Sequence, residues 1–94
     1  MLNKVLIIGN LTKDPEGPRQ AGNNEVADFR IASNERWGSS DDQQRTLFIQ
    51  VECWGKLASV VCQHLAKGRQ VLVEGRLQID EWGDGDDRKS RPKI

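Results

Sequence analysis

Apolar residues alternate with polar or aromatic ones between residues 45 and 54, and this period of two is typical of a β-strand. One face of such a strand carries Leu47, Ile49, Val51 and Cys53. The other face carries Thr46, Phe48, Gln50, Glu52 and Trp54. The segment therefore predicts a strand that turns one face to a core and presents its aromatic rings on the opposite, polar face.

Residues 70–82 repeat this pattern as a second strand. One face carries Val71, Val73, Leu77 and Ile79. The other face carries Glu74, Arg76, Gln78, Asp80 and Trp82. Leu72 is the exception to the alternation. Large rings that stand among charged and amide side chains on a sheet favour a flat ligand, and nucleobases are the obvious candidates.

Three more segments read as strands. Residues 3–11 predict a first strand, residues 26–36 a half-buried second strand, and residues 88–94 the beginning of a fifth. Residues 12–25 carry glycine, proline and asparagine signals that predict a loop without regular structure. A polar hairpin loop is predicted directly after Trp37.

The period changes to that of a helix after the strand at 45–54. Its apolar stripe consists of Leu57, Val61 and Leu65. Lys67 falls in the predicted last turn and Gly68 follows as a stop. Three strands, a helix, a strand and a return strand are the order of an OB-fold, an all-β, five-stranded Greek-key barrel. We expect one such domain over residues 1–94, with one short α-helix between strands 3 and 4.

Composition narrows the function classes. The chain has 94 residues, 14 basic and 14 acidic, so it has no net charge. No apolar run approaches the roughly 18 residues of a membrane helix, and we expect a soluble, cytoplasmic protein. Cys53 and Cys62 suit reduced, buried thiols, and His64 suits a helix surface. With a single histidine and no clustered catalytic groups, we expect no enzyme, no metal site and no cofactor.

The first strand is apolar on both faces, with Val5 and Ile7 on one and Leu6 and Ile8 on the other. A small antiparallel barrel needs only one apolar face, so the second predicts pairing between subunits. We expect the oligomer interface at Lys4, Leu6 and Ile8. The alternative is that the helix or a loop of the same chain covers this face.

Short strings along nearly the whole chain occur in an order and spacing that are specific together. They are Asn3-Lys4-Val5, Gly9-Asn10-Leu11, Asp14-Pro15-Glu16, Phe29, Ile31, Ala32, Trp37, Trp54-Gly55-Lys56-Leu57-Ala58, Leu65-Ala66-Lys67-Gly68, Val73-Glu74-Gly75-Arg76-Leu77 and Trp82. With these strings the chain resembles the bacterial single-stranded DNA-binding protein family.

The resemblance implies an OB-fold subunit of a homotetramer, or of a pseudotetrameric dimer, that binds single-stranded DNA with little sequence preference. It implies stacking rings at Trp37, Phe48, Trp54 and Trp82. The alternation does not select Trp37, which falls in the frame of the apolar side chains of the second strand. Members of the family usually continue into a flexible linker and an acidic tip that docks replication and repair proteins, whereas this sequence stops at Ile94 within the fifth strand.

The implied role is protection of single-stranded DNA in replication, repair and recombination, in the nucleoid-associated cytoplasm. For the phosphates we expect contacts from Lys4, Arg30, Lys56, Lys67 and Arg76. Two rival functions stay open. One is a replication-restart accessory subunit on the same fold that works chiefly through protein contacts, although the full ring set argues against it. The other is a pure assembly module.

Overall fold

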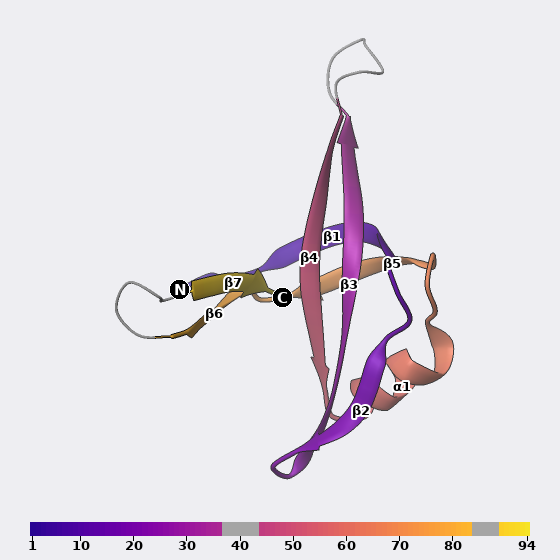
Figure 1. The fold of residues 1–94 in the computed structure, drawn as a ribbon, viewed down its shortest axis with the longest axis vertical. Coiled ribbons are helices and arrows are strands. Elements are labelled where there is room, and N and C mark those ends of the chain that lie inside the picture. Colours follow the sequence, from indigo (N-terminus) through magenta and orange to yellow (C-terminus); the bar gives the residue numbers. More distant parts are fainter. Residues whose placement is uncertain (37–43, 84–88) are drawn as a thin grey trace.

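The computed structural model of the protein describes residues 1–36, 44–83 and 89–94 (Figure 1). Within these ranges the chain forms seven strands and one helix. They are β1 (Val5–Leu11), β2 (Glu16–Ala21), β3 (Asn24–Arg36), β4 (Gln44–Trp54), α1 (Lys56–His64), β5 (Gln70–Gly75), β6 (Gln78–Trp82) and β7 (Lys89–Lys93). Neither the length nor the composition of α1, the only helix in these ranges, would let it cross a membrane.

The strands form one sheet in the order β5-β1-β3-β4-β7-β6, with β2 paired to β3. β3 and β4 make a long antiparallel ribbon that runs from Val26 opposite Trp54 to Arg36 opposite Gln44. β7 joins β4 in parallel through Gln50 and Lys93. Because β5 and β6 follow one another in the chain, the two ends of the sheet are linked by the chain itself. The predicted OB-fold with one helix is confirmed, as a partly open barrel.

β2 corrects the expectation that residues 12–25 lack regular structure. Residues 16–21 pair with β3, with Arg19 opposite Val26. The register shifts between Glu16 and Arg19, where Gly17 and Pro18 lie. Proline is tolerated at such a shift and on an outer strand because it has no N–H to donate to a ladder. The edge of β3 therefore supplies a pairing partner that local turn signals do not reveal.

The expected single strand at 70–82 is broken after Gly75. The amide of Asn3 donates to the Leu77 carbonyl at 2.9 Å and accepts from the Leu77 N–H at 3.0 Å. One side chain therefore takes the place of a neighbouring strand at the break. Leu77 and Ile79, predicted on the apolar face, do not join the core, since they are 41% and 52% exposed.

The helix also ends earlier than expected. α1 stops at His64, and Leu65 has an extended backbone. Lys67 therefore lies beyond the helix instead of in its last turn, and its backbone N–H donates to the Asp14 carboxylate at 2.8 Å. His64 is exposed on the helix, as predicted. Both cysteines are free thiols, Cys53 buried and Cys62 half-buried.

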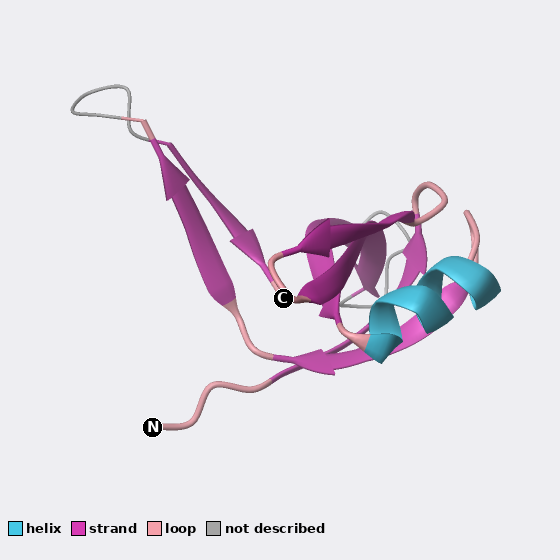
Figure 2. Cartoon of the chain, turned by 90° about the horizontal axis from the view of Figure 1, so that it is seen from below, coloured by secondary structure: helices cyan, strands magenta, loops and turns pink. Residues whose placement is uncertain are grey.

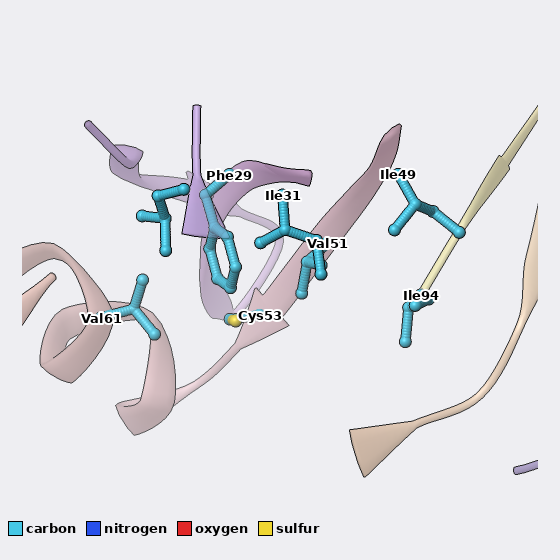
Figure 3. Packing of buried hydrophobic residues seen from close by; sticks show 8 residues of the cluster. Phe29, Ile31, Ile49, Val51, Cys53, Val61 and Ile94 are labelled. Carbon is cyan, nitrogen blue, oxygen red and sulfur yellow. The ribbon is translucent and has the colours of Figure 1, made fainter. Parts of the chain in front are cut away.

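Buried hydrophobic side chains pack together in one core (Figure 3). Its buried residues are Leu11, Phe29, Ile31, Ile49, Val51, Cys53, Val61 and Ile94. They come from alternate positions of β3 and β4, from the end of β1, from α1 and from the end of the chain. The predicted apolar face of β4 is thus confirmed for three of its residues. Leu47, its fourth, is 49% exposed. Each fully buried aliphatic or aromatic side chain contributes about 1.5–3 kcal/mol.

The β6–β7 hairpin reaches out from the barrel on the side away from α1 (Figures 1 and 2). Two attachments hold its base. One is the pair of hydrogen bonds between the Asn3 amide and the Leu77 backbone. The other is the end of β7, where the Ile94 N–H donates to the Gln50 carbonyl at 2.9 Å and the Ile94 carbonyl accepts from Glu52 at 2.8 Å. These attachments fix where the outward face of the hairpin lies relative to β4.

Candidate nucleic-acid interface

The outward side chains of β3 and β4 alternate with the core residues and share one face. In the register Asp28 lies opposite Glu52, Arg30 opposite Gln50 and Ala32 opposite Phe48. Directly paired residues of antiparallel strands point to the same side of a sheet. The structure thus places the Phe48 ring, 51% exposed, and the Trp54 ring, 52% exposed, on this outward side, as the alternation predicts.

β6 and β7 extend the same face. The Lys93 ammonium lies 3.1 Å from a Glu52 oxygen on β4 and 3.0 Å from an Asp80 oxygen on β6. Asp80 and Trp82 are two positions apart on one strand and therefore share a side, and Trp82 is 47% exposed. We call this surface the ring face. It comprises Asp28, Arg30, Phe48, Gln50, Glu52, Trp54, Asp80, Trp82, Arg91 and Lys93.

The ring face, which the sequence predicts to bind a polyanion, also carries acidic groups. Each carboxylate of the ring face is bonded to a donor of the same chain. Asp28 forms an ion pair with Arg19 and accepts from the Gln50 amide at 3.1 Å. Asp80 accepts from Lys93. The negative charge is thereby compensated locally, which lowers its repulsion of phosphates.

Glu52 has two partners. One oxygen accepts from the Trp54 indole N–H at 2.9 Å, and the other accepts from Lys93. Hydrogen bonds to Asp80 first, and then to Glu52, raise the pKa of Lys93 above its ordinary value, against the opposing effect of burial. The Lys93 side chain is only 14% exposed. A single ammonium therefore links the strand that carries Trp54 to the strand that carries Trp82.

Two arginines lie against rings. The guanidinium carbon of Arg30 is 5.4 Å from the centre of the Phe48 ring, and that of Arg91 is 5.6 Å from the centre of the Trp82 ring. Both distances are within cation–π range. Neither arginine forms an ion pair with a carboxylate among the described residues.

The other cations predicted to bind phosphate lie elsewhere. Lys4, directly before β1, forms an exposed ion pair with Glu74 of β5 at 2.9 Å. Lys56 is the first residue of α1. Lys67 lies in the connection after α1, and Arg76 lies at the break between β5 and β6. Of the predicted set, the described contacts bring only Arg30 into the ring face.

Sequence reasoning missed Arg19, Lys93 and Arg91. The alternation of residues 89–93 does place Arg91 and Lys93 on one side of a strand, which is a usable signal. Its meaning depends on the pairing of β7 with β6, which no local pattern supplies. Trp37 lies outside the described residues.

A second surface is apolar. Leu6, Ile8 and Leu72 are 62%, 55% and 64% exposed on the outward side of β1 and β5. Ile8 lies opposite Leu72 in the register, and Leu6 lies opposite Glu74. Because these side chains are exposed, the alternative that the helix or a loop covers this face fails for the described part of the chain. Three exposed large apolar side chains therefore lie together on this face.

Residues 2–94 match the model of the single-strand binding protein family. The chain is 45% identical over 85 residues to the single-stranded DNA-binding protein 1 of Chlorobaculum tepidum, covering 88% of this chain and 52% of that one. It is 42% identical over 86 residues to the single-stranded DNA-binding protein of Helicobacter hepaticus, with 89% and 51% covered. The chain thus spans about half the length of the curated relatives it matches.

Among solved structures, the Plasmodium falciparum SSB complex with ssDNA superposes with a TM-score of 0.87 at 27% identity. The match covers 100% of this chain and 85% of the other. This fold match agrees with the OB-fold described above, and the family model matches residues 2–94. The chain belongs to the single-strand binding protein family.

Proposed function

We propose that the chain binds single-stranded DNA with little sequence preference, by stacking bases on Phe48, Trp54 and Trp82. The observation that carries the proposal is the ring face, where these half-exposed rings stand among carboxylates that are already bonded within the chain. A ring offers a flat surface that accepts every base, which explains sequence tolerance. Each ring would contribute about 1–3 kcal/mol, or roughly 3–9 kcal/mol for the three before ordering costs. The family resemblance adds Trp37 as a fourth ring.

The phosphate contacts follow from position and charge. Arg30 is the best supported phosphate contact, because its guanidinium lies on the ring face beside Phe48. Lys4, Lys56, Lys67 and Arg76 are proposed from the sequence as further contacts along the strand. Each contact to a single strand would add a slope of about 0.7 in log affinity against log salt.

We further propose that the chain assembles with itself, as a homotetramer, through the exposed side of β1 at Lys4, Leu6 and Ile8. The exposed apolar side chains there support an interface between copies. The role in the cell would be protection of single strands during replication, repair and recombination in the nucleoid-associated cytoplasm. Docking of replication and repair proteins is proposed only for a chain that carries the family's C-terminal tail.

The direct test is ring removal. Trp54→Ala and Trp82→Ala should each weaken oligo(dT) binding by at least about 1 kcal/mol while the protein stays folded. Ile79→Ala is the matched control, because Ile79 is 52% exposed on the same strand as Trp82 but points to the other side. Its affinity should stay at the wild-type value. Unchanged affinity in both tryptophan variants would remove the stacking model.

The rival functions predict different results in this oligonucleotide-binding assay. We propose that the chain is not an enzyme, which the family match supports. A replication-restart accessory subunit would bind oligonucleotide weakly and depend little on the rings. A pure assembly module would show no fluorescence change with oligonucleotide at all.

A further inference from the structure

We infer that Arg91 and Trp82 form one nucleotide subsite, in which the indole takes a base and the guanidinium takes the adjoining phosphate. The inference rests on the proposed function. It adds to that function a cation that the sequence patterns did not select and couples this cation to a particular ring.

The two side chains meet on the β6–β7 hairpin. In the register Trp82 lies opposite Lys89, and Arg91 lies opposite Asp80, so the arginine is diagonal to the ring on the same side of the hairpin. The guanidinium carbon is 5.6 Å from the centre of the indole, and both side chains are exposed. A planar guanidinium can lie against a ring and still offer its N–H groups to a phosphate, which an ammonium cannot do as well.

Arg91 and Lys93 lie on the same side of β7 but differ in their ion pairs. Lys93 is 14% exposed and has its ammonium bonded to Glu52 and Asp80. Asp80 lies directly opposite Arg91 in the register, but its carboxylate forms an ion pair with Lys93 instead. Within the described residues, no carboxylate forms an ion pair with Arg91. Lys93 therefore bridges Glu52 and Asp80, whereas no carboxylate of the described residues competes with an external anion for the Arg91 guanidinium.

The same arrangement recurs on another pair of strands. Arg30 on β3 lies opposite Gln50, which is two positions from Phe48 on β4, and its guanidinium carbon is 5.4 Å from that ring. Asp80 is likewise two positions from Trp82. Phe48 and Trp82 thus each have a diagonal arginine on the neighbouring strand. A repeated ring and arginine unit matches the repeat of a single strand, in which every base is followed by a phosphate.

The test is a set of titrations with a short oligo(dT), sized for one subunit, at several salt concentrations. Arg91→Gln should lower the affinity about tenfold at low salt, as expected for one charge-assisted hydrogen bond. The slope of log affinity against log salt should fall by about 0.7 in magnitude, the value for one phosphate contact to a single strand. Arg91→Lys should keep the slope and lose part of the affinity, because the ammonium does not lie flat against the ring. Thermal unfolding should confirm that both variants stay folded.

Two further variants sharpen the result. Lys13→Gln removes an exposed positive charge from the β1–β2 connection, outside the ring face, and should leave the slope unchanged. Arg91→Gln combined with Trp82→Ala should cost less affinity than the sum of the two single changes, because both act on one nucleotide.

The inference is overturned if Arg91→Gln binds as tightly as wild type or tighter with an unchanged slope, since Arg91 then merely covers the ring. An equal loss of slope in Lys13→Gln also overturns it, because net charge alone then explains the effect. Failure of the proposed function looks different. In that case the wild-type protein itself shows no binding, or Trp54→Ala and Trp82→Ala both bind as well as wild type, whereas unchanged affinity in Trp82→Ala alone overturns only the inference.

Discussion

Replacing Lys93 by methionine should destabilise the fold, because Lys93 joins the β6–β7 hairpin to β4. Its ammonium is bonded to Glu52 at 3.1 Å and to Asp80 at 3.0 Å. Methionine keeps most of the aliphatic stem and removes the charge. Both carboxylates then lose a partner, in a place where the Glu52 side chain is only 18% exposed.

The magnitude follows from the exposure of each pair. The bond to Glu52 is charge-assisted and largely shielded from water, and such bonds contribute about 1.5–3 kcal/mol. The bond to Asp80 is worth less, about 0.2–1 kcal/mol, because Asp80 is 46% exposed and solvent screens the pair. Loss of the desolvation cost of Lys93 itself offsets part of the sum. We expect a net loss of about 2 kcal/mol, or roughly 8–16 °C in melting temperature for a domain of this size.

The assay is urea unfolding followed by tryptophan fluorescence, at one fixed protein concentration because assembly would shift the midpoint. Lys93→Arg should stay close to wild type. Arg91→Met is the matched control, since it removes a charge from the same side of β7 but breaks only a cation–π contact of about 0.5–1 kcal/mol. A loss below about 0.5 kcal/mol in Lys93→Met, or an equal loss in Arg91→Met, would refute the bridging role of Lys93.

The pH dependence has a definite sign. Folding raises the pKa of Lys93 above its ordinary value of 10.5, chiefly through the hydrogen bond to Asp80. The stabilisation is therefore fully present below pH 10.5 and is lost as the pH rises through the higher pKa of the folded state. The difference between wild type and Lys93→Met should stay constant from neutral pH to that limit. If wild type and Lys93→Met reach equal stability between neutral pH and pH 10.5, the ion pairs of Lys93 are not the source of the stabilisation.

Three other predictions concern packing, thiol chemistry and assembly. Gly9→Ala should lower stability by about 1–3 kcal/mol in urea unfolding, because its Cβ would lie 2.9 Å from the Ala32 backbone carbonyl oxygen, and an unchanged midpoint would contradict this close contact. Burial raises the pKa of both thiols, and Cys53 is 6% exposed, so a thiol reagent should label Cys62 first by mass spectrometry, and faster at higher pH. Equal labelling rates would refute this. Leu6→Asp places a charge on the apolar side of β1 and should lower the mass measured by light scattering, and an unchanged mass would argue against that interface.

The sequence predicts those features of the fold and of the ring face that local periodicity sets. Alternation on β4 places Phe48 and Trp54 on one side and Val51 on the other, because successive side chains of a strand must point to opposite faces. The same rule extends to Trp82 on β6. The helix start is also local, although its end at His64 falls short of the expected turn at Lys67.

The parts that the sequence does not predict depend on segments that meet only in the fold. Residues 12–25 look like a loop because Gly17 and Pro18 interrupt them, yet the edge of β3 pairs with residues 16–21. The break after Gly75 requires Asn3 from the other end of the chain. The compensation of Glu52 and Asp80 by Lys93 joins three strands, so the acids of the ring face look unfavourable until the pairing is known.

Base stacking on the ring face is tested most directly by a tryptophan fluorescence titration of the wild-type protein with oligo(dT) at two salt concentrations. Stacking of bases on the indoles of the ring face predicts saturable quenching at low salt, weaker binding at high salt and little response to duplex DNA of the same length. The absence of quenching by oligo(dT) at low salt would contradict the claim that these rings hold single strands.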